Sequence, residues 1–273
     1  MAGKLYLVGT PIGNLGDLSP RAAKTLEEAD FIAAEDTRVT VKLLNYLGIK
    51  KPMLSYYEHN KKSRGGEIID RLLSNQNCAL VTDAGMPAIS DPGEDMVRLA
   101  YENGITVESV PGPSAVVTAL AMSGMPSGRF TFEGFLTVNK PGRRAHLNEI
   151  KNEKRTMIFY EAPHKLIATL SDMLEIFGDR KIALVRELTK IHEEVIHTTF
   201  KEALEKYKDS APKGEFVLIV SGYTEEKKKY SLEEAVNLAR EFCEKGDPAS
   251  LAAKKAAEVT DLKKGDIYRG MNK

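Results

Sequence analysis

The chain has 273 residues, 42% of them hydrophobic and 29% charged, a composition typical of a globular protein long enough for two domains. Lys and Arg together number 39, as do Asp and Glu, which excludes a uniformly basic nucleic-acid binder and leaves only a local basic surface. The two cysteines, Cys78 and Cys243, make no disulfide framework, and no Cys and His cluster has zinc spacing. The chain opens without a signal-peptide pattern, and no apolar run reaches the roughly 20 residues that span a bilayer. We therefore expect a cytoplasmic protein with no membrane partner and no metal.

The first part of the chain alternates strand-like and helix-like segments. Buried-strand patterns occupy 5–9, 31–35, 78–85 and 106–112, and helical patterns occupy 19–30, 37–48, 67–75, 93–104 and 113–124. This alternation predicts an open, largely parallel α/β sheet. Ligands bind such sheets beyond the carboxyl ends of the strands, so the loops that follow the strands should share one edge. Those loops are 9–17, 35–38, 83–93 and 111–114.

The pattern changes near residue 125 to that of a second, mixed α/β domain with antiparallel pairing. Strands are expected at 129–136, 156–162, 181–188, 193–200 and 215–223, with a helix at 163–178. A charged linker at 224–230 leads to three short helices that begin at capping residues. We expect an N-terminal α/β domain at 1–125, a second α/β domain at 126–223 and a small helical tail domain at 230–273.

The opening loop, "GTPIGNLGD" (9–17), looks like a nucleotide-binding turn. No Gly-Lys-Ser/Thr follows, which excludes a P-loop, and the glycines have G-x-x-x-G-x-x-G spacing instead of G-x-G-x-x-G. The loop is either a tight turn that needs glycine or a nest of N–H groups for an anion or a substrate backbone. The second interpretation makes Thr10, Gly13 and Asn14 candidate substrate contacts.

Two further loops, "VTDAGMPAISDPG" (81–93) and "VPGPSA" (110–115), are rigid and follow predicted strands. That position favours ligand contact, although a rigid surface loop has the same composition. The polar clusters "EDTR" (35–38) and "YYEHN" (56–60) follow on the same edge. As a set, their side chains suit proton transfer and phosphate contact. Any one of them, taken alone, could instead serve only to cap a helix. The candidate catalytic residues are Glu35, Arg38, Glu58 and His59, with Arg38 and Asn60 as candidate substrate contacts.

Basic residues concentrate at 139–155 and again in the tail from Lys254. The first stretch is either an exposed helix or a phosphate contact surface that includes Arg143 and Arg144. The tail is either a helix-turn-helix-like module or a packing appendage.

Seven segments in order carry a resemblance to a known family: "LVGTPIGNLGDLSPRAAKTLEEADFIAAEDTR", "TDAGMPAISDPG", "VPGPSAVVTALAMSG", "FTFEGFL", "FYEAPHKL", "REL" with "HEE", and "KGEFVLIV". Together they resemble the bacterial small-subunit ribosomal RNA cytidine 2′-O-methyltransferases of the tetrapyrrole-methylase superfamily. The resemblance covers roughly the whole chain. It implies two α/β domains with S-adenosyl-L-methionine in the cleft between them, a small C-terminal helical segment, 16S ribosomal RNA in the small subunit as substrate, and a homodimer.

The resemblance also implies where the cofactor lies. By similarity its contacts fall on Asp83, Ala84, Gly85, Met86, Pro87, Ile89, Ser90, Ser114, Ala115, Phe132, Tyr160, Glu161, Ala162, Leu188 and Gly214. Methyl transfer to a ribose hydroxyl needs positioning and a proton acceptor, and it needs no metal. Glu35, Glu58 and His59 are the candidate acceptors. Because the cofactor has no phosphate, the opening loop is expected on the substrate side, so that bulk at Gly13 should impair RNA methylation more than cofactor affinity.

Two alternatives stay open. A tetrapyrrole C-methyltransferase resembles G-x-G-x-G-D at the first loop, whereas Asn14 stands in that neighbourhood here and Asp17 comes later. The second alternative is an RNA-binding module without catalysis, which would bind the ribosome through its tail and transfer no methyl group.

Overall fold

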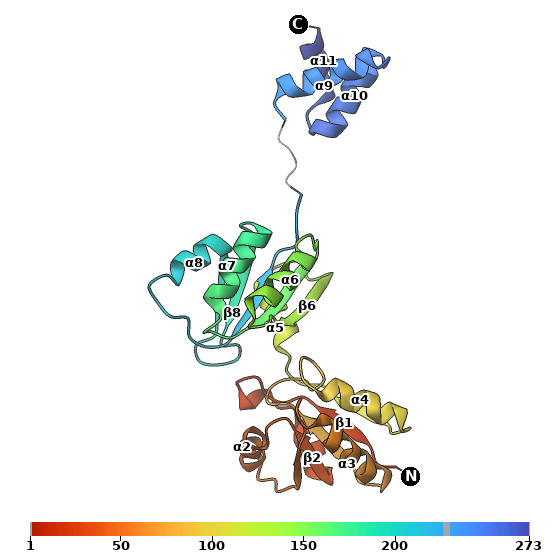
Figure 1. Cartoon of the computed structure of the whole chain (residues 1–273), viewed down its shortest axis with the longest axis vertical. Coiled ribbons are helices and arrows are strands. Elements are labelled where there is room, and N and C mark those ends of the chain that lie inside the picture. The colour runs from red at the N-terminus through yellow and green to blue at the C-terminus, as the bar shows by residue number, and fades with distance from the viewer. Residues whose placement is uncertain (1, 226–229, 273) are drawn as a thin grey trace. The chain divides into compact units, whose positions relative to one another are not determined.

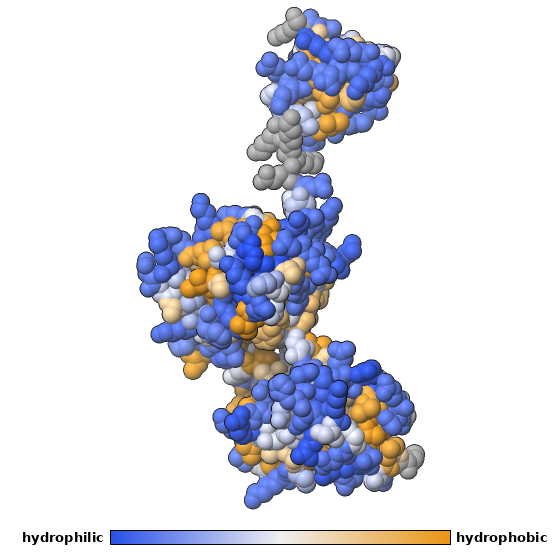
Figure 2. Space-filling view, in the orientation of Figure 1, coloured by the Kyte–Doolittle hydropathy of each residue, from blue (hydrophilic) through white to orange (hydrophobic). Residues whose placement is uncertain are grey.

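The computed structural model of the chain describes residues 2–225 and 230–272 (Figure 1). Residues 1–223 form one compact unit that holds two β-sheets, and residues 224–273 form a second, helical unit. Residues 226–229 of the expected charged linker lie outside the described residues. Hydrophilic residues cover most of each unit on the face drawn in Figure 2. In the described ranges, no helix is long and apolar enough to cross a membrane.

The first sheet has five strands in the order β3-β2-β4-β1-β5, and every neighbouring pair is parallel. Their bounds are β1 Leu5–Val8, β2 Phe31–Ala34, β3 Met53–Ser55, β4 Cys78–Val81 and β5 Val107–Val110. Because all five run the same way, the loops that follow them meet at one edge, as the alternation predicts. The sequence analysis missed β3, which has only three residues, all half-buried, and so carries no periodic signal.

Helices cover both faces of this sheet. They are α1 Pro20–Glu28 and α2 Thr37–Leu47 on one face, and α3 Lys61–Leu73 and α4 Gly93–Glu102 on the other. Alternate strand residues serve the two cores, since Phe31 packs with α3 and α4 whereas Ile32 packs with α1 and α2. A short 3-10 turn, η1 (Leu15–Asp17), follows β1. Ser19 caps α1, and its Oγ accepts a hydrogen bond from the Ala22 N–H.

The second sheet is mixed, with the strand order β6-β7-β10-β8-β9. Its strands are β6 Phe130–Phe135, β7 Thr156–Glu161, β8 Lys181–Arg186, β9 Glu194–Thr199 and β10 Phe216–Val220. β6 and β7 are parallel and the other pairs are antiparallel, as expected. On one face lie α6 Lys140–Ile150, α7 Leu166–Phe177 and α8 Phe200–Lys206. The sequence analysis did not anticipate α8, which is capped by Thr199 at the end of the predicted strand.

Helix α5 (Ala115–Ser123) covers the other face of the second sheet. Its Val116, Ala119 and Leu120 pack with Ile158 of β7 and with the inward residues of β8 and β10. The boundary at residue 125 stays a prediction, although α5, which precedes it, packs on the second sheet. Chain order assigned α5 to the first sheet, whereas its packing assigns it to the second.

The helical unit contains the three expected helices, α9 Leu232–Glu244, α10 Ala249–Thr260 and α11 Lys264–Met271. Ser231 opens α9 with a capping box, in which its hydroxyl accepts from the Glu234 N–H and the Glu234 side chain accepts from the Ser231 N–H. The helical unit has a small core of its own, made of alanines of α9 and α10 with Val236 of α9 and Ile267 of α11.

Candidate functional site

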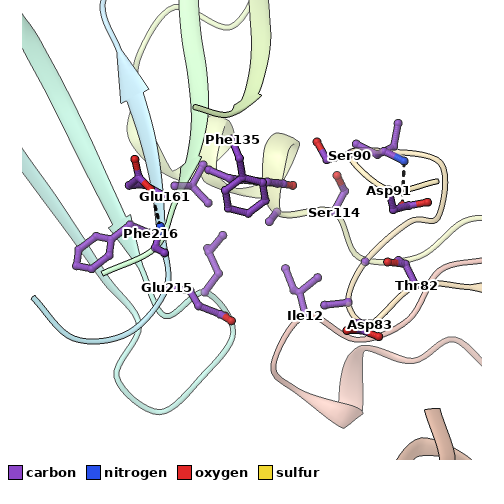
Figure 3. Close-up of a pocket in the computed structure, with 18 of the residues that line it drawn as sticks. Ile12, Thr82, Asp83, Ser90, Asp91, Ser114, Phe135, Glu161, Glu215 and Phe216 are labelled. Atoms are coloured by element: carbon purple, nitrogen blue, oxygen red, sulfur yellow. Dashed lines mark hydrogen bonds between the residues drawn. The ribbon is translucent and has the colours of Figure 1, made fainter. Parts of the chain in front are cut away.

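A cavity of about 500 Å³ lies at the carboxyl edge of the first sheet and is closed on its other side by β7, β8 and β10 of the second (Figure 3). Strand-end loops of both sheets therefore supply its walls. Its lining residues are Ile12, Glu35, Thr82, Asp83, Ala84, Gly85, Met86, Ile89, Ser90, Asp91, Ser114, Ala115, Phe135, Tyr160, Glu161, Ala162, Pro163, Val185, Leu188, Glu215, Phe216 and Val217. Its size is within the range of cofactor sites.

Thr10 is buried and pairs with Gly85, a lining residue. Its N–H donates to the Gly85 carbonyl at 2.9 Å, and the Gly85 N–H donates back to the Thr10 carbonyl at 3.1 Å. The Thr10 hydroxyl donates to the Thr82 carbonyl at 3.2 Å. These bonds position the 82–85 loop, and the role of Thr10 as a substrate contact stays a prediction.

Two carboxylates, Glu35 and Asp83, lie at the ends of the neighbouring strands β2 and β4. Oε2 of Glu35 accepts a hydrogen bond from the Thr82 hydroxyl at 2.5 Å, and Oδ1 of Asp83 accepts one from the Asp36 N–H at 3.0 Å. Partial burial and the nearby charge of Glu35 raise the pKa of Asp83. A cationic ligand in the cavity would relieve this repulsion.

The 88–91 segment holds a strained conformation beside these carboxylates. Ala88 and Ser90 have φ of 69° and 65°, in the left-handed region that residues with a Cβ rarely adopt. The Asp91 carboxylate fixes the segment by accepting from the N–H groups of Ala88 at 2.9 Å, Ile89 at 3.2 Å and Gly93 at 2.7 Å. Burial raises the pKa of Asp91 although these donors oppose the shift. Strain held this way is typical of ligand-binding segments.

The opposite wall comes from the end of β7. Glu161 is buried, and its carboxylate accepts from the Thr169 hydroxyl and from the Ala162 N–H. Tyr160 contacts the rings of Phe132 and Phe135, with centroids 5.0 and 5.3 Å away. Burial raises the pKa of Tyr160. This wall is thus aromatic and carries one fixed carboxylate.

The turn around Leu188 completes the second wall. Oε1 of Glu187 accepts from the Glu215 N–H and from Lys190 Nζ, both at 2.9 Å, and Lys190 also bonds to the Glu215 carboxylate. Gly214 lies against Glu187, where an added Cβ would meet the Glu187 side chain at 2.5 Å. Gly214 therefore shapes this turn from outside the cavity lining.

Most residues expected at the cofactor line the cavity. The exceptions are Pro87, Phe132 and Gly214, which stand directly behind lining residues or turns. Of the candidate catalytic residues, Glu35 alone is part of the lining. The catalytic and cofactor-binding roles of these residues stay predictions, and among the catalytic candidates position favours Glu35.

The other catalytic candidates lie outside the lining. The side chain of Arg38 is 88% exposed, and its guanidinium bonds to the Asp36 carboxylate, whose pKa these bonds hold at about 2. Glu58 pairs with Lys61 at 2.7 Å, and His59 contacts the ring of Tyr57. Arg38 lies in α2, which follows β2, and Glu58 and His59 follow the edge strand β3.

Several substrate candidates serve the protein's own structure. Asn60 donates to the Ser55 carbonyl at 3.0 Å and accepts from the Tyr57 N–H, which closes its loop. Asn14 accepts from the Gly16 N–H and caps η1. Gly13 has φ of 147°, and an added Cβ would lie within 3.0 Å of Leu188, Thr189 and Lys190. The opening loop is therefore packed on the Leu188 turn.

The basic stretch is also partly neutralised. Arg143 has a side chain that is 8% exposed, and it forms an ion pair with the buried Asp172 of α7 at 2.6 Å. Arg144 bonds to the other oxygen of Asp172 and to Glu175. Arg143 therefore joins α6 to α7 through this ion pair, and its role as an RNA contact stays a prediction.

Sequence reasoning missed several lining residues, including Phe135, Asp91 and Glu215. Asp91 carried a signal, because it stands in the rigid "SDPG" segment after a strand. Phe135 carried none, because nothing local shows that β6 ends against the first sheet.

The cavity is acidic. Five lining residues are carboxylic acids (Glu35, Asp83, Asp91, Glu161 and Glu215), and none of its lining residues in the described ranges is Lys, Arg or His. Such a lining favours cations and hydroxyl groups and disfavours phosphate. In those ranges, no group of acids, His and Cys has the arrangement of a metal site.

Residues 4–204 match the family model described as Tetrapyrrole (Corrin/Porphyrin) Methylases. The chain is 44% identical to a protein of Synechocystis over 98% of this chain and 96% of that one. It is 48% identical to a protein of Halalkalibacterium halodurans over 97% and 93%. Both are named Ribosomal RNA small subunit methyltransferase I. The chain belongs to this methyltransferase family.

A solved structure shares the fold at low sequence identity. It is uroporphyrin-III C-methyltransferase from Thermus thermophilus complexed with S-adenyl homocysteine, with a TM-score of 0.57, 18% identity, and coverage of 80% of this chain and 97% of that one. The expected tetrapyrrole-methylase-like arrangement of two α/β sheets is thereby confirmed.

Proposed function

We propose that the chain transfers a methyl group from S-adenosyl-L-methionine to the 2′-hydroxyl of a cytidine in 16S ribosomal RNA of the small subunit. The near-full-length identity to proteins named Ribosomal RNA small subunit methyltransferase I carries this proposal. The acidic cavity between the two sheets supports it independently. The assignment of the 2′-hydroxyl as the methyl acceptor, and of cytidine as the target nucleotide, rests on the motif resemblance.

The residues of the cavity fit the cofactor. S-adenosyl-L-methionine supplies an electrophilic methyl group and its own leaving group. Its sulfonium and ammonium are cations, which suit a lining with five carboxylic acids, and its ribose hydroxyls can donate to them. Ser90, Ser114 and the apolar side chains of Met86 and Leu188 complete a mixed surface of the kind that small-molecule sites have.

Glu35 and Asp83 are suited to accept the proton of the ribose hydroxyl. Both line the cavity at adjacent strand ends, and the Thr82 hydroxyl orients Glu35. The raised pKa of Asp83 increases its basicity when ionised. Glu35 can take the proton directly or share it with Asp83.

A tetrapyrrole substrate fits this chain less well. Uroporphyrinogen carries eight carboxylates, and an acidic cavity edge without a lining cation would repel them. A ribose carries no carboxylates of its own, so its entry into this lining meets no such repulsion.

Labelled S-adenosyl-L-methionine tests the proposal. We expect label to enter 16S ribosomal RNA of small subunits purified from cells that lack the modification, and nuclease digestion to place it on a 2′-O-methylcytidine. Parallel samples contain naked 16S RNA and uroporphyrinogen. Label in the porphyrin alone would establish the tetrapyrrole alternative, and label in neither would establish a binding module.

We also propose a cytoplasmic homodimer. Helix α5 is apolar on all sides, but only one side packs on the second sheet. Val117, 54% exposed, and Met122, 36% exposed, stand on the outer side. A second copy covering this face would remove it from water. Light scattering should give twice the chain mass for the protein and a lower mass for Val117→Glu.

A further inference from the structure

A bulge in β6 places an exposed aromatic ring at the cavity. Phe132 pairs with Ile158 but Gly134 pairs with Phe159, so Glu133 is an extra residue in β6. Gly134 has φ of 64°, and Glu133 turns away and bonds to His146 at 3.0 Å. In a regular strand, residues three apart face opposite sides, but the bulge brings Phe132 and Phe135 to the same side.

Phe135 is 58% exposed and lines the cavity, with its ring against Tyr160 on one side only. Figure 3 places it over the middle of the cavity, between the Glu161 wall and the Ser90 wall. A large ring that is partly in water and lines a ligand cavity is available to contact a bound molecule.

A second exposed apolar side chain stands on the first sheet's side. Ile89 is 49% exposed and also lines the cavity, in the segment that Asp91 fixes. The two segments are close, because a Cβ on Gly134 would lie 3.5 Å from Ser90 Oγ. Phe135 and Ile89, one from each sheet, therefore border the same part of the cavity.

We propose that Phe135 stacks on the nucleobase of the target nucleotide, with Ile89 as the apolar contact opposite. This inference rests on the proposed function and extends it, since it requires the target base to be unstacked from its RNA neighbours. Proteins that recognise unpaired RNA nucleotides commonly stack the splayed-out base on an aromatic side chain.

Variants of Phe135 test this with small subunits that lack the modification as substrate. We expect Phe135→Ala and Phe135→Leu to raise the KM for subunits about 10-fold or more, because stacking is lost in both. Phe135→Tyr should keep the KM of the parent protein. The Kd for S-adenosyl-L-methionine, measured by calorimetry, should change less than the KM for subunits in Phe135→Ala and Phe135→Leu.

Phe130→Ala is the matched control, since Phe130 begins the same strand, is exposed and does not line the cavity. An unchanged KM in Phe135→Ala, or a Leu variant equal to the parent, overturns the stacking. A loss of cofactor affinity that accounts for the whole effect assigns Phe135 to the cofactor and also overturns it. If the parent protein methylates no ribosomal RNA, the proposed function itself fails, which is a different result.

Discussion

Asp83 is ionised at a position where its charge is unfavourable to the folded protein. Partial burial and the neighbouring Glu35 both raise its pKa. A carboxyl whose pKa is higher in the folded state than in the unfolded state destabilises the fold when ionised. The penalty is fully present above the raised pKa and fades as the pH falls through it. A cationic ligand bound beside Asp83 would offset this penalty.

Asp83→Asn should therefore stabilise the protein and weaken cofactor binding. We expect the Tm at pH 7 to rise by up to about 2 °C, since solvent limits the repulsion, and the gain to shrink toward pH 4. The Asp36 N–H can still donate to the new side-chain oxygen. Calorimetry should show a weaker Kd for S-adenosyl-L-methionine. Asp70→Asn, on the exposed side of α3, is the control, and a lower Tm in Asp83→Asn would contradict the argument.

Glu35→Gln tests the proton acceptor. Gln keeps an oxygen for the Thr82 hydroxyl but cannot take a proton at neutral pH. We expect kcat for subunit methylation to fall about 100-fold or more, with cofactor Kd within a few fold. Glu58→Gln and His59→Ala, which lie outside the cavity lining, should leave kcat nearly unchanged. A full-rate Glu35→Gln enzyme would move the role to Asp83.

Two strained turns, one from each sheet, set the shape of the site at the level of elements. The 88–91 segment depends on Asp91, and the Leu188 turn has positive φ at Glu187 and Thr189. Both turns are held by carboxylates that accept backbone N–H groups. Loss of such an acceptor leaves several donors without partners at once.

Asp91→Ala should loosen the 88–91 segment. It removes the acceptor of three N–H groups, so we expect a Tm lower by about 5 °C and at least tenfold weaker cofactor binding. Asp91→Asn retains one acceptor and should be intermediate. Thermal unfolding and calorimetry measure both effects, and an unchanged Kd in Asp91→Ala would separate the segment from the cofactor.

Gly13→Val tests how the opening loop acts. The sequence analysis expected RNA methylation to suffer more than cofactor affinity. The packing of Gly13 on Leu188, a lining residue, predicts that both fall together, because a Cβ must displace that turn. Gly66→Ala, in α3 with open space around it, is the matched control. Selective loss of methylation would restore the substrate-side interpretation.

At the scale of the whole molecule, the cavity belongs entirely to residues 1–223. The helical unit has its own core of Ala235, Ala239, Ala253, Ala256 and Ile267 with their neighbours. Cofactor binding should therefore not depend on the tail.

A chain that ends at Tyr223 should bind S-adenosyl-L-methionine with a Kd within twofold of the full chain. If the tail contacts RNA, the KM for small subunits rises in the short chain while that Kd stays constant. Calorimetry and subunit methylation measure the two quantities. A short chain that folds, as judged by circular dichroism, but binds no cofactor would show that the tail supports the site.

Local signals account for what was predicted correctly. Ser19 before Pro20, the capping box at Ser231 and the buried runs of β4 and β10 each act within a few residues. Arg143 shows the limit of such reasoning, because its partner Asp172 comes 29 residues later on another helix. A count of charges along the chain cannot show that this guanidinium is buried and paired.

The sequence by itself determined the alternation of strands and helices, the rigid loops at the strand ends and the family motifs. Each of these depends on residues close together in the chain or on their order. Only the tertiary structure decided that α5 packs on the second sheet, that Gly13 lies on the Leu188 turn and that Phe135 reaches the cavity. These contacts join segments far apart in sequence, and the packing of two separate cores determines them.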